Sequence, residues 1–178
     1  MRTLALFALL GFTATSAGNA QIRASARVGA TWSSTLISDQ IIQPIDVKAG
    51  IAPTLSLGIS IPSGKKYRLG LEAVFSSGSV KASENGSDTD LGSIRTATVL
   101  LGAEGPLMIR NLYWRAGVGL MKYFPSEKEG LFRQGGPTRL TGNFTAEYRR
   151  PLSPGWEAVA ALRYGYHQFI TRELEAAG

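Results

Sequence analysis

The sequence contains no cysteine and only one histidine, His167. Without cysteine, neither a disulfide framework nor a thiolate metal site can form. A single imidazole leaves carboxylates as the main metal ligands, and we expect neither a metal site nor a cofactor. After the N-terminal segment no apolar stripe of useful length with a 3.6-residue period appears, and the 21 glycines disfavour long helices. The sequence therefore predicts a chain built from β-strands.

The first twenty residues have the pattern of a secretory signal. Arg2 forms a short positive region, an apolar stretch runs from Leu4 to Phe12, and Gly18-Asn19-Ala20 has small residues on either side of a larger one. The apolar stretch is shorter than the roughly 20 residues that a membrane-spanning helix needs. We expect cleavage after Ala20, which makes residues 1–20 a signal peptide and residues 21–178 one exported domain.

The charge is positive, with a formal net value of +6. A basic chain invites a nucleic-acid interpretation. However, the arginines are scattered through the sequence and glutamates recur in the same segments, as expected for charges that pair internally. We therefore expect no nucleic-acid partner.

Seven segments after residue 20 alternate between apolar side chains and polar, charged or glycine residues. This two-residue period is typical of β-strands with one apolar face. The clearest example is LYWRAGVGLMKYF, in which Leu112, Trp114, Val118 and Leu120 share one face while Arg115 lies on the other. The segments are 22–32, 47–61, 67–75, 96–104, 112–124, 139–149 and 156–167.

The connections between these segments alternate in length. Short turns with the sequences PSGKK, GPLMIRN and PLSPG alternate with longer polar loops such as KASENGSDTDLGS and PSEKEGLFRQGG. Short turns at one end and long loops at the other are typical of outer-membrane barrels, whose short turns are periplasmic. The predicted fold is all-β: an up-and-down antiparallel transmembrane β-barrel.

A soluble lipocalin-like barrel is the alternative, because it would turn the same apolar faces inward. Aromatic residues near both ends of the apolar faces favour the membrane barrel, since they resemble the two aromatic girdles at membrane interfaces. The predicted girdles consist of Tyr67, Trp114, Tyr148 and Trp156 near the short turns and Trp32, Phe75 and Phe124 near the long loops.

Segments such as RAGVGLMKYF and ALRYGYHQF resemble the small eight-stranded outer-membrane proteins of Gram-negative bacteria, the outer-membrane protein β-barrel domain group. The resemblance covers nearly all of the chain after residue 20. It implies a porin-like fold in the cell envelope more strongly than it implies an activity. The partners we expect are outer-membrane lipid and the outer-membrane insertion machinery, around a monomeric barrel; the ligand of the loops stays open.

Charged residues on the non-apolar faces are predicted to point into the barrel. The interior of a small barrel is just wide enough for side chains to fill it, and buried charges are favourable only when they are paired. A structural network of ion pairs is the main interpretation, and a gated pore or solute site is the alternative. The network comprises Arg27, Arg68, Glu72, Glu104, Arg115, Glu147, Arg149, Glu157 and Arg163, with Arg27, Arg68 and Arg115 as the candidate partners of Glu72.

Three functions compete on this evidence. The first is a non-enzymatic envelope scaffold that presents surface loops, and the second is a narrow channel for small solutes. The third is a lipid-modifying enzyme, because the resemblance includes a lipid A deacylase with a histidine and a serine close together on a late strand. Here His167 has no serine two positions on. We therefore expect no enzymatic activity and favour the scaffold.

The number of segments poses a separate problem. Single-chain bacterial barrels have an even number of strands, and an open edge in lipid leaves unpaired backbone groups that cost several kcal/mol each. With seven segments visible, we expect an eighth strand beyond Gly178. In this chain, the first and seventh segments are expected to be adjacent but imperfectly joined.

Overall fold

The computed structural model describes residues 2–15, 22–33, 37–39, 45–84, 87–126 and 138–168. All regular elements in these ranges are β-strands, and none of the described residues belongs to a helix long and apolar enough to cross a membrane. The strands are β1 (Arg2–Thr15), β2 (Arg23–Ser33), β3 (Ile37–Asp39), β4 (Ile45–Ala49), β5 (Ala52–Ser63), β6 (Tyr67–Glu84), β7 (Ser87–Pro106), β8 (Leu112–Pro125), β9 (Thr138–Ser153) and β10 (Trp156–Gln168).

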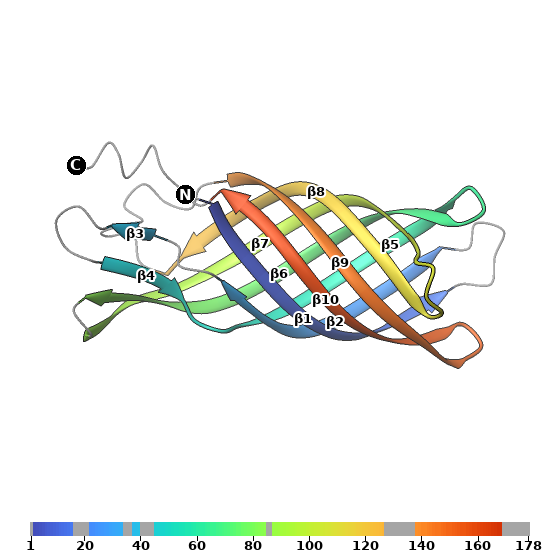
Figure 1. Cartoon of the computed structure of the whole chain (residues 1–178), viewed down its shortest axis with the longest axis horizontal. Coiled ribbons are helices and arrows are strands. Elements are labelled where there is room, and N and C mark those ends of the chain that lie inside the picture. The colour runs from blue at the N-terminus through green and yellow to red at the C-terminus, as the bar shows by residue number, and fades with distance from the viewer. Residues whose placement is uncertain are drawn as a thin grey trace.

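Eight of these strands form a closed antiparallel barrel (Figure 1). From β5 to β10 each strand pairs with the next along the chain. The ring is completed because β2 pairs with β5, while β1 pairs with β2 on one side and β10 on the other. Because every barrel strand has two partners, no barrel edge is left open to lipid. The predicted all-β, up-and-down barrel is confirmed.

The burial of the side chains alternates over long stretches of the barrel wall, for example along residues 51–57. In β8, Val118 and Leu120 are exposed on the outside, whereas Met121 and Tyr123 are buried inside. In β9, Phe144 and Tyr148 are exposed on the outside, whereas Thr145 and Glu147 are buried inside. The alternation is the reverse of that in a soluble barrel, since the exposed face is the apolar one.

The strand β1 corrects the prediction for closure. The segments 22–32 and 156–167, now β2 and β10, are not adjacent but lie on either side of β1. The prediction that they would be imperfectly joined is wrong, because β1 closes the barrel without a strand from beyond Gly178. The physical reason is that the apolar N-terminal stretch itself forms a barrel strand, although its sequence does not alternate between apolar and polar residues. Leu10 and Phe12 are exposed outside, while Leu9 and Thr13 are buried inside.

The inner face of β1 fits its neighbours. Leu9 packs with Val159 and Ala161, which lie on the inner face of β10. Opposite Arg27 in β2 stands Gly11. A Cβ atom at Gly11 would lie 2.6 Å from the Cγ atom of Arg27, so glycine leaves the space that this large side chain occupies.

At the long-loop end, β6 and β7 continue beyond the barrel wall. Residues 67–76 of β6 pair with β5. Residues 80–84 of β6 pair with β4, which in turn pairs with β3. The result is a small sheet that projects from one end of the barrel (Figure 1). The two ends of the molecule therefore differ, with tight turns at one and extended strands at the other.

Candidate functional site: an ion-pair network in the barrel lumen

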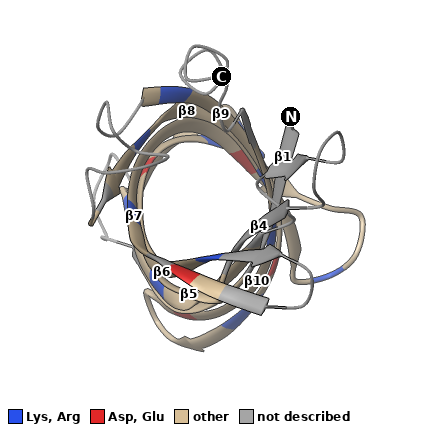
Figure 2. Cartoon of the chain, turned by 90° about the vertical axis from the view of Figure 1, so that its left-hand side faces the viewer, with Lys and Arg blue, Asp and Glu red and all other residues tan. Residues whose placement is uncertain are grey.

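The predicted lumen residues lie on the inner wall, in the half of the barrel near the short turns. Their strands are β2, β6, β7, β8, β9 and β10, which surround the barrel axis (Figure 2). Several of these charged side chains are almost completely buried, and Arg27, Glu147 and Arg163 are each no more than 1% exposed. Burial of this kind is favourable only with charged partners and hydrogen bonds.

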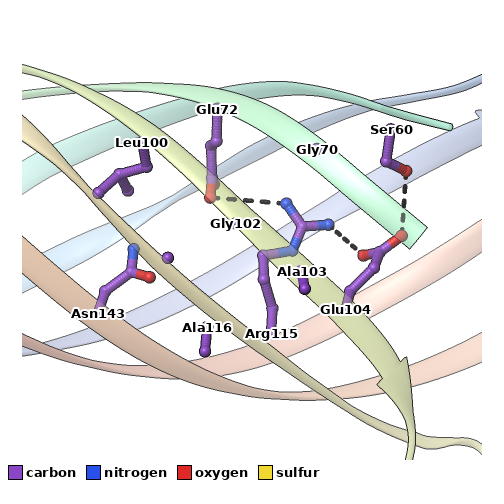
Figure 3. A pocket seen from close by; sticks show the side chains of 11 residues that line it. Ser60, Gly70, Glu72, Leu100, Gly102, Ala103, Glu104, Arg115, Ala116 and Asn143 are labelled. Carbon is purple, nitrogen blue, oxygen red and sulfur yellow. Dashed lines mark hydrogen bonds and ion pairs between the residues drawn. The ribbon is translucent and has the colours of Figure 1, made fainter. Parts of the chain in front are cut away.

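Arg115 lies between three glutamates from three other strands. Its guanidinium donates a hydrogen bond of 2.6 Å to Glu104 and forms ion pairs of 3.4 Å with Glu147 and 3.5 Å with Glu72. Figure 3 shows the guanidinium between the carboxylates of Glu72 and Glu104. One arginine from β8 thus links β6, β7 and β9, which lie beside β8 along the barrel wall.

Glu72 lies at the end of the network that is farther from the short turns. One of its carboxylate oxygens accepts hydrogen bonds from Arg163 at 2.5 Å and from Arg27 at 3.1 Å, as well as one from the hydroxyl of Ser56. Arg163 also donates to the hydroxyl of Thr145 at 3.1 Å. Arg163 is a partner of Glu72 that the sequence analysis did not propose.

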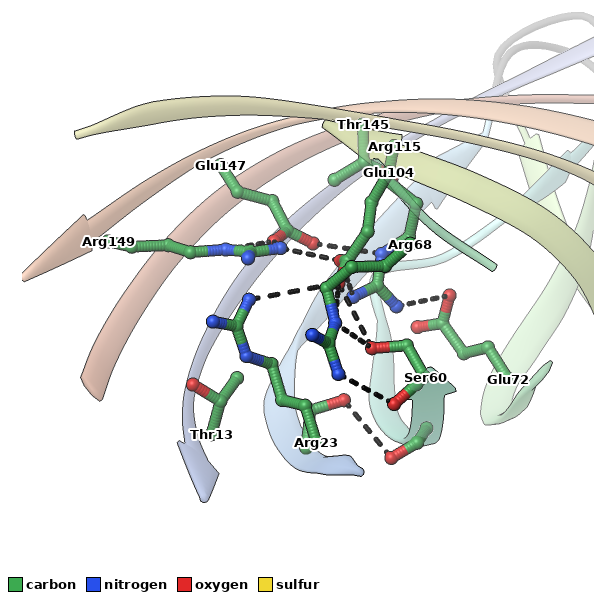
Figure 4. Close-up of polar contacts among 12 residues, drawn as sticks. Thr13, Arg23, Ser60, Arg68, Glu72, Glu104, Arg115, Thr145, Glu147 and Arg149 are labelled. Atoms are coloured by element: carbon green, nitrogen blue, oxygen red, sulfur yellow. Dashed lines mark hydrogen bonds and ion pairs between the residues drawn. The ribbon is translucent and has the colours of Figure 1, made fainter. Parts of the chain in front are cut away.

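Glu104 has the corresponding position nearer the short turns. It accepts hydrogen bonds from Arg149 at 2.6 Å and from Ser60 at 3.0 Å, and its carboxylate lies 3.5 Å from the Nε of Arg68. Arg68, a candidate partner of Glu72, therefore lies against Glu104 instead. Figure 4 shows these side chains converging from opposite walls of the barrel.

Arg149 and Glu147 belong to the same strand and face the same side of it. Arg149 donates two hydrogen bonds to Glu147, at 2.9 and 2.6 Å, and its guanidinium stacks 4.4 Å from the centre of the Tyr113 ring. Glu147 also forms an ion pair of 3.1 Å with Arg27. These contacts join the deeper and shallower parts of the network.

Arg23 belongs to the network although the sequence analysis did not include it in the predicted set. It lies 3.7 Å from Glu157 and 3.8 Å from Glu104, and Glu157 accepts a hydrogen bond of 3.1 Å from Thr13 in β1. The available signal was its position, because Arg23 shares the inward alternation of Arg27 on the same strand. Thr13 was missed because its segment was interpreted only as a signal peptide.

The network leaves little free space around Arg115. The cavity beside it, lined by Glu72, Glu104, Asn143 and neighbouring residues, has a volume of about 10 Å³ (Figure 3). This is close to the minimum that one water molecule needs. The described ion pairs join six arginines and four glutamates, so the lumen has an excess of positive charge.

Towards the long loops the inner wall changes in character. Hydroxyl pairs link adjacent strands, with 2.6 Å between Thr31 and Thr54 and 2.7 Å between Ser76 and Thr96. These neutral contacts cross from one strand to the next, whereas Arg27, Arg149 and Arg163 also contact glutamates on strands that are not their neighbours. The connection between distant walls is therefore concentrated near the short turns.

The residues predicted for the two girdles lie on the outer face. The rings of Tyr67 and Trp114 are 6.3 Å apart on adjacent parts of the wall near the short turns. Near the long loops, the ammonium of Lys122 lies 5.4 Å from the centre of the Phe124 ring. The other predicted members are exposed on the same face: Trp32, Phe75, Tyr148 and Trp156.

His167 is the residue on which the enzymatic alternative depends. Its backbone belongs to β10 and pairs with Thr3 and Thr141, but its side chain lies outside the described set. Gln168 is the last described residue of the chain.

No protein-family model matches this chain, and none of the curated proteins compared with it does. Among solved structures, the chain is similar to the translocator domain of the autotransporter NalP from Neisseria meningitidis, with 15% sequence identity and a TM-score of 0.29. That alignment covers 95% of this chain and 88% of the other.

Proposed function

We propose that this protein is a non-enzymatic barrel of the bacterial outer membrane whose lumen is filled by ion pairs and whose long-loop end is displayed at the cell surface. The observation that carries the proposal is the bridging of the lumen at Glu72 of β6, which pairs with Arg163 of β10 on the opposite wall and with Arg27 of β2. A barrel whose interior serves to hold its walls together acts as a scaffold. The loops and the projecting β3–β4–β6–β7 sheet are then the parts of the protein that act at the cell surface.

Residence in the membrane is supported by the outer face. Large apolar side chains such as Leu101, Val118 and Leu140 are each at least 65% exposed. In water such a continuous apolar band would promote aggregation, whereas in a bilayer it is the required surface. The proposal includes export through a leader, assembly by the outer-membrane insertion machinery of a Gram-negative cell, and a monomeric state, since the closed barrel leaves no barrel edge for a second copy.

A scaffold is favoured over a channel because every glutamate of the network is paired with at least one arginine. An open pore needs charges that face water, but Glu72 and Glu104 are each at most 4% exposed and are held by arginines from other strands. Separating these pairs would leave buried charges without partners, at a cost of about 3–5 kcal/mol for each broken pair. The resting barrel is therefore closed to ions.

Conductance in planar lipid bilayers tests this function. The purified full chain is expected to give no steady single-channel current. Arg115→Ala removes the guanidinium that lies between three glutamates and enlarges the cavity beside it, so it is expected to produce a small current. Arg150→Ala, which removes an exposed arginine on the outer face, is the matched control and is expected to stay silent.

Two results would contradict the scaffold. A steady current through the wild-type barrel that changes on Arg115→Ala would establish the channel. A change in the mass of membrane lipid that depends on His167 would establish the enzyme.

A further inference from the structure

The short-turn end of the barrel is positively charged on its outside. Three short turns connect β5 to β6, β7 to β8, and β9 to β10, and no aspartate or glutamate occurs in residues 61–68, 105–113 or 148–156. Four basic side chains of these regions are exposed. We name them the basic collar, which consists of Lys65, Lys66, Arg110 and Arg150.

The turns of the basic collar lie against one another. A Cβ atom at Gly105, at the end of β7, would be 2.6 Å from the ring of Tyr67 at the start of β6. On the other side, the carbonyl of Asn111 accepts a hydrogen bond of 2.9 Å from the backbone N–H of Arg149. The three turns therefore form a continuous rim along one part of the barrel end, at the right of Figure 1.

One of these turns presents apolar side chains beside its cation. Met108 is fully exposed and Ile109 is 67% exposed, and Arg110 follows them directly. The turn has a defined shape, because Leu107 donates a backbone hydrogen bond to Leu112 and Asn111 adopts the left-handed conformation, with φ of 64°. An ordered, exposed apolar tip next to a basic residue suits the boundary between acyl chains and head groups.

The aromatic girdle places the collar relative to the bilayer. Tyr67 directly follows Lys66, Tyr148 lies two residues before Arg150 on the outer face of β9, and Trp156 lies on the outer face of β10. Aromatic residues of this kind mark the depth of the head groups. The basic side chains of the collar lie next to these aromatic residues, on the side of the turns, and are therefore at the height of the lipid phosphates.

The other end of the barrel does not share this charge pattern. The segment 81–93 contains Glu84, Asp88 and Asp90 with a single lysine, and the segment 125–136 contains acidic and basic residues in equal number. The excess of positive charge is thus specific to the short-turn end. Inside the barrel, Arg23 and Arg68 add to it at the same level.

We propose that the basic collar binds the anionic head groups of glycerophospholipids in the leaflet that surrounds the short turns. The proposal rests on the proposed function, because it requires the barrel to lie in a bilayer. Phosphodiester groups with a net negative charge would accept hydrogen bonds from the lysines and arginines, while Met108 and Ile109 enter the apolar boundary beneath them. A basic residue near an anionic membrane surface contributes about fivefold to binding.

Lipid retention tests the proposal. The purified full chain is folded into vesicles of equal parts phosphatidylglycerol and phosphatidylcholine and extracted with mild detergent, and the retained lipids are identified by mass spectrometry. We expect phosphatidylglycerol to be retained in at least tenfold excess. The double variants Lys65→Gln/Lys66→Gln and Arg110→Gln/Arg150→Gln should each lower this excess about tenfold or more.

The matched control is Arg95→Gln/Lys122→Gln, which removes two exposed cations from the outer face near the long loops and should lower the excess much less than either collar variant, because acidic residues of the neighbouring loop offset these cations. Equal retention of the two lipids by the folded wild type would overturn the proposal, as would an equal loss in the control. Folding is measured separately, by the mobility of unheated protein on a denaturing gel. A chain that fails to fold into these vesicles would overturn the membrane barrel itself, and with it the proposed lipid binding by the basic collar.

Discussion

At the scale of single residues, the lumen depends on a few side chains that each satisfy several charges. Glu72 shows this best, since one of its oxygens accepts hydrogen bonds from both Arg27 and Arg163. In a narrow interior with little room for water, removing one partner leaves an uncompensated buried charge. Removing both partners of a pair leaves a neutral gap, which costs less.

The first prediction concerns this coupling. Glu72→Gln removes the carboxylate charge that both Arg163 and Arg27 contact and should reduce the free energy of unfolding by about 3–5 kcal/mol. Arg163→Met should have a similar effect, and the double variant should cost at least about 1 kcal/mol less than the two single losses together. Urea unfolding in lipid vesicles measures all three. Strict additivity would mean that water separates the two charges.

The sequence predicts the direction of these side chains but not their partners. Alternation along a strand places Arg115, Arg149 and Arg163 on the inner face, since a two-residue period leaves no other choice. The pairing of Glu72 with Arg163 joins β6 to β10, which lie on different parts of the wall. It depends on the stagger of several strands and on which opposite side chain the arginine can reach. A local sequence pattern determines neither.

At the scale of elements, β8 provides the clearest test of which face meets lipid. Val118 is exposed on the outer face, in the middle of a strand that runs from Leu112 to Pro125. Val118→Arg should cost about 2–4 kcal/mol of folding free energy in a bilayer, because it places a cation near the midplane. Val118→Leu keeps the site apolar and should change stability by less than about 1 kcal/mol. Equal stability of the two variants in vesicles would refute the outward assignment.

The strand β1 shows why an element can be misassigned from sequence. An apolar core flanked by a positive charge and small residues describes a leader, and the run from Leu4 to Phe12 has no alternation of apolar and polar residues that would indicate a strand. The structure contains the strand, whereas cleavage after Ala20 stays a prediction. Cleavage would remove β1 and leave β2 and β10 with unpaired edges, so a cleaved chain would need another strand between them.

Paired cysteines test the position of β1, and the absence of native cysteine makes the readout clean. In the chain that retains residues 1–20, Leu10 lies opposite Val28 and opposite Ala160. Leu10→Cys combined with either Val28→Cys or Ala160→Cys should form a disulfide on oxidation. Val28→Cys with Ala160→Cys should not, because two strand spacings of roughly 4.8 Å each exceed the reach of a disulfide. A disulfide between those two positions would show that β2 and β10 are direct neighbours.

At the scale of the whole molecule, the two ends have different roles. Near the short turns, charged side chains bridge the lumen and basic residues surround the rim. Near the long loops, the inner wall has neutral hydroxyl pairs and the strands extend into a small sheet. The stabilising contacts are thus concentrated at one end, which leaves the other end free to vary in sequence without loss of the barrel.

Gel mobility distinguishes a closed barrel with its apolar face in a membrane from a soluble barrel. Folded in detergent and loaded without heating, the protein should migrate at a different apparent size from the boiled sample, because the closed barrel stays intact and compact. Boiling should convert it to the unfolded position. A protein that is monomeric in water without detergent and migrates identically before and after boiling would contradict the membrane barrel and support a soluble one.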